Sequence, residues 1–391
     1  MKIEGLILRE IFTSAGKPTV EVGVVVKSHA FLAQIPSGES RGGREAAVLS
    51  MAEAQTGWRS IQTRVIGADF KYLKEWDGFL LRLDGTPDKS KLGGNIILGL
   101  SLAFARALAF SENKELWQVL REEFFAGEKE GVKPLIFANL IEGGVHAQDN
   151  LALQEYMVVK EMGDSSAKSV EELVNLYKKL GENLRRKNKL ENIPLGTEGG
   201  YMLDFKDDFE PLAVLSGMVQ DENLALDAAA NSFHKDGKYV VDEKKMSAAE
   251  LAEVYAGYFA KEPKLISIED PFAENDVAGF QLLRERLPDK WIVGDDLTVT
   301  NPDLIKKYAQ GGAINAVIIK ANQIGSLSEA CAAMKLAKEL GLKRIVSHRG
   351  EETEDVFLVH LAKAGNAEAV KIGAPARERI LKYDEVLRLY P

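Results

Sequence analysis

The feature that most constrains the fold is a repeat that begins beyond residue 220. Short apolar segments each end in one ionisable residue and are followed by helix-like sequence. After a first interval of roughly 42 residues, the intervals are roughly 23 to 28 residues, and the ionisable residues are Asp227, Glu269, Asp295, Lys320, His348 and Lys371. A strand, a helix and a return loop use roughly 25 to 30 residues if eight such units fill a ~250-residue barrel. The spacing therefore predicts an α/β fold with a C-terminal β/α (TIM-like) barrel.

This prediction also has a geometric consequence. The carboxyl ends of all strands in such a barrel meet on one face, where the active site lies. We therefore expect the six ionisable residues to point into one pocket. The alternative is a doubly wound open sheet, whose strand ends also carry function. The barrel is favoured because no glycine-rich nucleotide fingerprint follows the first strand.

The N-terminal part of the chain has a different pattern. Residues 19–26 alternate as a strand does, and helix-period segments follow at 44–55 and 92–120. Strands followed by helices predict a smaller α+β domain. A Gly, Lys and Glu-rich stretch at 126–132 then precedes an apolar run. We expect an N-terminal α+β capping domain at 1–130 and the barrel, with the active site, at 131–391.

Composition limits the class of partner. The 391 residues are 46% hydrophobic and carry a formal charge of −9. Without a basic surplus, we expect neither a nucleic-acid nor a membrane-surface role. The apolar run 96–110 is interpreted as a buried helix. Cys331 is the single cysteine, and acids interrupt the N-terminus before any apolar signal core, so a reducing cytoplasm is expected.

The three acids suggest a metal. Asp227, Glu269 and Asp295 follow neighbouring predicted strands, and hard oxygen ligands in small number suit Mg²⁺. Any one of these acids taken alone is more often a helix cap or a salt-bridge partner. As a set at strand ends, however, the carboxylates would repel one another, and a divalent cation would relieve that repulsion.

Two lysines suggest a base. Lys320 and Lys371 follow later predicted strands, and we expect them on the far side of the pocket from the three acids. A lysine among other cations and near a metal has a lowered pKa and can act as a base near neutral pH. The ordinary alternative for a single lysine is an exposed, solvated side chain, but Lys320 follows the apolar run 317–319.

Several longer motifs occur in a recognisable order. They are Ser-Ile-Glu-Asp-Pro-Phe (267–272), Gly-Asp-Asp-Leu-Thr-Val-Thr-Asn-Pro (294–302), Lys-Ala-Asn-Gln-Ile-Gly-Ser (320–326), Ser-His-Arg (347–349) and Lys-Ile-Gly-Ala-Pro (371–375). Shorter stretches near Gly143, Gln154 and Glu198 continue the order over nearly the whole chain. In these motifs the sequence resembles the enolase family.

The resemblance implies roles for individual residues. Asp227, Glu269 and Asp295 would bind a first Mg²⁺, and Ser40 would bring in a second with substrate. Lys320 would remove the C2 proton of 2-phosphoglycerate, and Glu198, supported by Glu155, would protonate the leaving 3-hydroxyl. The other expected substrate contacts are Arg349 at the phosphate, Lys371 at the carboxylate, and His146, Gln154 and His348 lining the pocket. A homodimer or higher homo-oligomer is also implied.

Departures from the family pattern lie near this expected site. Gly350 and Glu351 stand where the family usually has Ser and Gly, so a hydroxyl is lost and a negative charge is added near the phosphate. Glu39 and Arg41 replace Ala and Thr, Thr197 replaces Asp, and the segment 13–19 lacks the usual Asp, Arg and Asn. Two other hypotheses therefore stay open. One is a paralogue acting on a related phosphorylated or phosphonylated 2-hydroxy acid, and the other is a non-catalytic scaffold.

Overall fold

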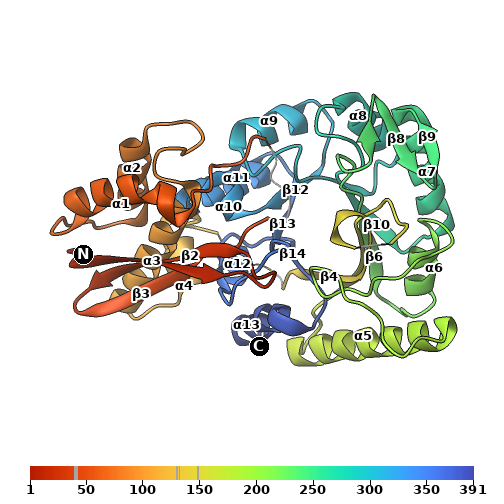
Figure 1. Cartoon of the computed structure of the whole chain (residues 1–391), viewed down its shortest axis with the longest axis horizontal. Coiled ribbons are helices and arrows are strands. Elements are labelled where there is room, and N and C mark those ends of the chain that lie inside the picture. Colours follow the sequence, from red (N-terminus) through yellow and green to blue (C-terminus); the bar gives the residue numbers. More distant parts are fainter. Residues whose placement is uncertain (39–42, 129–130, 132, 148) are drawn as a thin grey trace.

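The chain folds into a small N-terminal domain beside a closed barrel (Figure 1). The computed structural model describes residues 1–38, 43–128, 131, 133–147 and 149–391. The N-terminal domain begins with an antiparallel sheet of β1 (Gly5–Phe12), β2 (Pro18–Val26) and β3 (His29–Gln34). Its helices are α1 (Met51–Val65), α2 (Leu73–Asp84), α3 (Gly94–Glu112) and α4 (Leu116–Phe124). The predicted α+β character of this part is confirmed.

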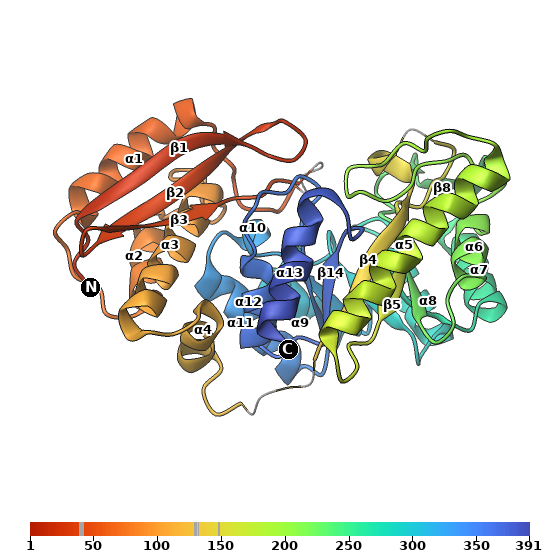
Figure 2. The ribbon, with the colours of Figure 1, turned by 90° about the horizontal axis from the view of Figure 1, so that it is seen from below.

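The sheet packs on α3. Alternate valines of β2, among them Val22, are buried, and a Cβ added to Gly99 of α3 would lie 2.6 Å from the Val22 side chain. Among the described residues α3 is the one helix long and apolar enough to cross a membrane, but 83% of its apolar stretch is buried inside the protein. The expected buried helix is therefore confirmed, as the core helix of this domain (Figure 2).

The helix expected at 44–55 is partly wrong, because α1 starts only at Met51. Ser50 and Glu53 form a reciprocal capping box, which fixes the start of the helix. Before it, the amide of Ala46 donates to the Gln323 carbonyl of the barrel at 2.8 Å. Tertiary hydrogen bonds therefore replace the first turn. The helical segment expected at 92–120 is two helices, because Asn113 adopts a left-handed conformation (φ 53°) between α3 and α4.

The C-terminal domain is a closed eight-stranded barrel in the order β10-β11-β12-β13-β14-β4-β5-β6, so the open-sheet alternative is excluded. Its strands are β4 (Leu135–Glu142), β5 (Glu155–Lys160), β6 (Asn223–Asp227), β10 (Leu265–Glu269), β11 (Trp291–Gly294), β12 (Ala316–Ile319), β13 (Lys343–Ser347) and β14 (Ala369–Ile372). Apolar side chains such as Phe137, Met157 and Ile318 form a buried cluster of strand residues. As in other barrels of this size, the interior is packed with side chains.

One strand runs against the others. β5 pairs antiparallel with both β4 and β6, whereas the other neighbouring pairs in the barrel are parallel. The simple expectation of eight parallel strands is therefore wrong at β5. Because β5 is reversed, its first residue, Glu155, lies level with Asp227 at the carboxyl end of β6.

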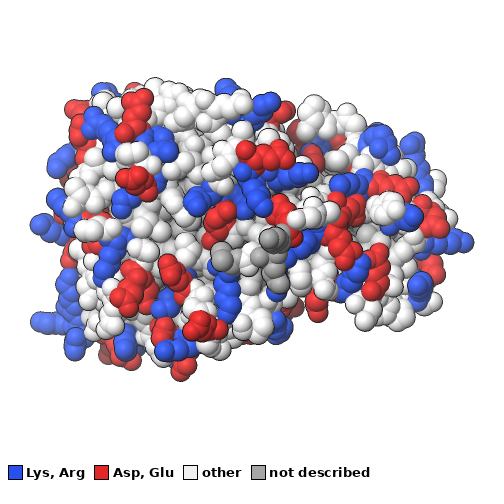
Figure 3. All heavy atoms as spheres, turned by 180° about the vertical axis from the view of Figure 1, so that it is seen from behind, with Lys and Arg blue, Asp and Glu red and all other residues white. Residues whose placement is uncertain are grey.

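Helices surround the barrel, with α5 lying along its outside (Figure 2). They are α5 (Ser166–Asn188), α6 (Glu210–Ser216), α7 (Ala248–Lys261), α8 (Val277–Arg286), α9 (Pro302–Gln310), α10 (Ala321–Ile324), α11 (Leu327–Glu339), α12 (Phe357–Ala364) and α13 (Ile380–Leu389). Short 3₁₀ helices occupy Gly144–His146 and Arg377–Arg379, and β7 (His234–Lys235), β8 (Lys238–Val241) and β9 (Lys244–Met246) form a small separate sheet. On the face shown in Figure 3, acidic and basic side chains are intermingled.

Candidate active site

A pocket lies at the carboxyl ends of the barrel strands and collects most of the expected residues. Asp227 ends β6, and Asp295, Lys320 and His348 each follow directly on β11, β12 and β13. The residues that line the pocket are Gly38, Glu45, His146, Gln154, Glu155, Glu198, Asp227, Ala229, Asp270, Asp295, Asp296, Lys320, Gln323, Ser347, His348, Arg349, Gly350 and Lys371. Five of the six predicted strand-end residues therefore line one pocket; the sixth, Glu269, is not among its lining residues but contacts Lys371.

Lys371, on β14, is the centre of the acidic floor. Its ammonium group lies 2.7 Å from Asp227 Oδ2, 2.8 Å from Glu269 Oε2 and 3.1 Å from Glu155 Oε2. The lysine side chain is only 2% exposed, so these contacts occur away from water. Three carboxylates from β5, β6 and β10 are therefore held around one buried cation.

Lys320 forms a second pair of this kind, with Asp295 Oδ2. Both lysines thus contact the acids, and the prediction that they lie on the far side of the pocket is wrong. The predicted lowering of the lysine pKa assumes a nearby metal ion and stays a prediction. Among the protein groups alone, burial lowers the pKa of Lys320, but the Asp295 and Glu269 carboxylates act against it and the pKa lies above its usual value. Opposite charge at contact distance dominates.

The carboxylates offer oxygen donors for a divalent cation. Glu269 is 3% exposed, and its Oε1 atom makes no hydrogen bond with any described residue. Burial, followed by the charge of Asp227, raises the pKa of Glu269 well above its usual range. Buried carboxylates that repel one another, with an oxygen left over, suit a hard cation. Asp227, Glu269 and Asp295 therefore offer the kind of oxygen donor that Mg²⁺ prefers.

A second group of oxygens overlaps this set. Asp270, Asp295 and Asp296 each offer a carboxylate oxygen, and these oxygens lie within 4.8 Å of one another. Asp270, however, already accepts hydrogen bonds from the amides of Asp295 at 3.0 Å and Asp296 at 2.7 Å. Its carboxylate thus already holds the loop that carries Asp295.

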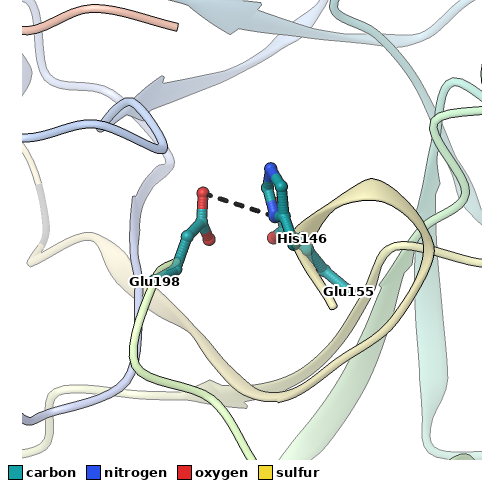
Figure 4. A group of neighbouring side chains, drawn as sticks. All are labelled: His146, Glu155 and Glu198. Carbon is teal, nitrogen blue, oxygen red and sulfur yellow. Dashed lines mark ion pairs between the residues drawn. The ribbon is translucent and has the colours of Figure 1, made fainter. Parts of the chain in front are cut away.

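His146, Glu155 and Glu198 lie beside one another (Figure 4), and His348 lies next to Glu198. His146 Nδ1 lies 3.9 Å from Glu198 Oε1 and 4.0 Å from Glu155 Oε1, and His348 Nε2 lies 3.2 Å from Glu198 Oε2. Burial by itself raises the pKa of Glu198, but His348 and His146 hold it below its usual range. Burial and then the charge of Glu198 raise the pKa of Glu155. The pKa values of the two glutamates are therefore shifted in opposite directions.

Arg349 extends from the loop after β13 and is 6% exposed. Its guanidinium lies 3.2 Å from Glu45 Oε2, and Nη1 donates to Asn322 Oδ1 at 3.2 Å. Gln154 precedes β5, and its backbone amide donates to the backbone carbonyl of Asp227 at 3.0 Å. Ser40, expected as a ligand of a second metal, lies outside the described residues, as do Glu39 and Arg41.

The sequence analysis missed two buried acids beside these groups. Glu142 is fully buried and accepts hydrogen bonds from the amides of Glu198 and Gly200; burial and the charge of Glu198 raise its pKa to about 8. It ends β4 as Asp227 ends β6, so the apolar run before it carried the same signal upstream of the repeat. No sequence pattern marked Glu45, because it belongs to the site only through its ion pair with Arg349, which is distant in the chain.

The fold and this pocket together define a β/α-barrel enzyme that can move protons and hold a hard cation. A family profile described as the N-terminal domain of enolase matches residues 3–120, and one described as the C-terminal TIM barrel domain of enolase matches residues 130–390. Among curated relatives, the enolase of Methanocaldococcus jannaschii is 38% identical over 99% of this chain and 95% of its own length.

Two further relatives agree. The enolases of Neorickettsia sennetsu and Pyrococcus furiosus are each 38% identical over 99% of this chain, which corresponds to 98% and 94% of their own lengths. The chain therefore belongs to the enolase family, and it is a carbon–oxygen lyase of the hydro-lyase type.

Proposed function

We propose that this enzyme interconverts 2-phosphoglycerate and phosphoenolpyruvate. One observation carries the proposal: in the order of the barrel, β12 and β5 are four strands apart and so lie on opposite sides of the eight-membered ring. Lys320 follows β12, and Glu155 begins β5. A base and an acid on opposite sides of one pocket suit removal of a proton from one face of a substrate and of a hydroxyl from the other.

Lys320 is the proposed base that takes the proton from C2. Its ammonium contacts Asp295, which lies in the proposed metal set. Asp227, Glu269 and Asp295 would hold Mg²⁺, and Ser40 would help to bring in a second ion with the substrate; such ions would supply positive charge next to the substrate carboxylate. The Asp295 carboxylate raises the pKa of Lys320 against the effect of burial, and a cation that shared this carboxylate would weaken that effect.

Glu198 is the proposed acid for the leaving 3-hydroxyl. Glu155 supplies the proton, because its pKa is raised while that of Glu198 is lowered. Both carboxylates offer an oxygen within 4.8 Å of the other and of His146. Two carboxylates whose environments push their pKa values apart are a recurring arrangement for such transfers.

The remaining contacts orient the substrate. Arg349 binds the phosphate, because a guanidinium presents paired donors to phosphate oxygens. Lys371 contacts the substrate carboxylate, and His146, Gln154 and His348 line the pocket. Orientation of this kind supplies a large share of the rate in such reactions.

A second candidate is favoured by one observation. Gly350 lines the pocket beside Arg349 and has no side chain to contact a phosphate there. A related phosphorylated or phosphonylated 2-hydroxy acid is therefore the alternative substrate. We also propose a cytoplasmic homodimer or higher homo-oligomer, which light scattering of the purified protein tests.

The deciding experiment follows the absorbance of the enol phosphate after 2-phosphoglycerate is added to the purified protein with Mg²⁺. Turnover supports the proposal. An inactive protein that still binds Mg²⁺ by titration calorimetry contradicts it and favours the alternative substrate. A protein that neither turns over nor binds Mg²⁺ favours the scaffold hypothesis.

A further inference from the structure

The turn that carries Arg349 is clamped by two segments of the N-terminal domain. Ser37 and Glu351 exchange two backbone hydrogen bonds, at 2.9 and 3.1 Å. Ser14 donates from its amide to the Glu352 carbonyl at 2.8 Å, and its hydroxyl accepts from the Glu352 amide at 3.0 Å. The backbone of Glu351 and Glu352 is thus held on both sides by residues distant in the chain.

The Glu351 side chain faces a lysine of the same N-terminal segment. Its carboxylate lies 2.5 Å from Lys17 Nζ, and it is 2% exposed whereas Lys17 is 58% exposed. Lys17 is itself held in the tight turn between β1 and β2, since its carbonyl accepts from the Thr13 amide at 2.9 Å. The negative charge expected near the phosphate is therefore present but paired.

This pair adjoins the end of the pocket where Arg349 lies. Gly350, which precedes Glu351, and Gly38, which follows its partner Ser37, both line the pocket. Glu352 accepts from the Arg349 amide at 3.0 Å, and Arg379 donates to the carbonyls of Arg349 and Gly350. Glu351 and Arg349 are therefore parts of one braced turn.

We propose that Lys17 is a positioning residue for phosphate binding, which it supports by neutralising Glu351 and tying the 13–18 turn to the Arg349 turn. This inference rests on the proposed function, since it assumes an anionic substrate at Arg349. Glu351 is one of the departures from the family pattern noted above, and Lys17 lies in the segment 13–19, which also departs from that pattern. The structure brings these two departures into contact, so each offsets the charge of the other.

The expected size of the effect follows from charge. At an effective dielectric of ~20, two unit charges within ~10 Å interact by more than the thermal energy. An unpaired Glu351 carboxylate next to the pocket therefore weakens the binding of a phosphate by roughly tenfold. The chemical step is not expected to change, because neither residue lies among the pocket-lining groups.

The test is a double-mutant cycle on the full-length protein. Lys17→Gln is expected to raise the KM for 2-phosphoglycerate roughly tenfold and to leave kcat within about twofold of the wild-type value. Lys17→Arg keeps the positive charge and is expected to keep the wild-type KM. Adding Glu351→Gln to Lys17→Gln is expected to return KM toward the wild-type value. Lys187→Gln is the matched control, because Lys187 is 59% exposed and pairs with Glu210 far from this pocket.

The dissociation constant for inorganic phosphate, measured by calorimetry with Mg²⁺, is the second readout. It is expected to change in parallel with KM, and it needs no turnover. If the wild type does not turn over 2-phosphoglycerate, the proposed function fails, and the phosphate cycle still decides this inference. Unchanged phosphate affinity in Lys17→Gln, a loss that persists in the double variant, or no phosphate binding by the wild type would each overturn it.

Discussion

The ammonium group of Lys371 lies 2.7 Å from Asp227 Oδ2, deep in the barrel and almost fully out of water. Two further carboxylates, of Glu269 and Glu155, lie within 3.1 Å of the same ammonium. Three carboxylates are therefore buried close together in the barrel, and the Lys371 ammonium balances part of their negative charge.

Removing this balance is expected to destabilise the protein. Replacing Lys371 with Met leaves buried carboxylates without their cation, which typically costs about 3 to 5 kcal/mol. Thermal unfolding without Mg²⁺ should show a lower Tm, and added Mg²⁺ should raise that Tm more in the variant than in the wild type, because the ion relieves the repulsion. The exposed Lys187→Met is the control. An unchanged Tm without Mg²⁺ would show that Lys371 is not the balancing charge.

The two overlapping acidic sets make different predictions for metal binding. Asp227→Asn is expected to weaken Mg²⁺ binding by roughly 10 to 100-fold, since it removes an anionic ligand. Asp296→Asn should leave Mg²⁺ affinity within about twofold, because Asp296 belongs only to the set whose Asp270 carboxylate already accepts two backbone amides. Titration calorimetry without substrate measures both. If Asp296→Asn weakened Mg²⁺ binding more than Asp227→Asn did, the ion would instead be assigned to Asp270, Asp295 and Asp296.

Lys320 is expected to be required for exchange of the C2 proton. Lys320→Ala should abolish incorporation of solvent deuterium into 2-phosphoglycerate, because the alanine side chain cannot accept a proton. Proton NMR of the recovered substrate measures it. Mg²⁺ binding by the variant is the control for an intact site. Exchange that continued in Lys320→Ala would rule out this lysine as the base.

A buried acid away from the pocket predicts a dependence of stability on pH. Asp77 of α2 accepts hydrogen bonds from Ser101 and from both the amide and the hydroxyl of Ser328 at the start of α11. Burial is the main cause that raises its pKa from 3.8 to about 7. The folded state therefore holds the proton more tightly than the unfolded state does. The stabilisation by Asp77 is complete below about pH 4 and is lost as pH rises toward 7.

Asp77→Asn tests this dependence because the amide cannot titrate. The variant's stability relative to wild type should rise between pH 4 and pH 8 by up to about 4 kcal/mol, following a shift of roughly three pKa units. Urea unfolding at several pH values measures it. Parallel pH profiles for the two proteins would mean that Asp77 does not titrate in this range.

Much of the barrel could be predicted because strand ends are a local property. An apolar segment that ends in Asp227 or Lys320 marks a strand, and the closure of a β/α barrel brings such ends together whatever separates them along the chain. The same local signal at Glu142 was available but lay outside the regular repeat. The reversed direction of β5 was not predictable, because hydrophobic pattern does not encode strand direction.

What the sequence by itself determined is therefore the class of fold, the family, and the set of ionisable groups delivered to one face. Only the tertiary structure decided which of these groups touch: Lys371 against three acids, Lys320 against Asp295, and Lys17 against Glu351. The physical reason is that the two kinds of information act over different distances along the chain. Periodicity reports the direction of a side chain relative to its own backbone, whereas a charge responds to whatever lies within a few ångströms of it in space.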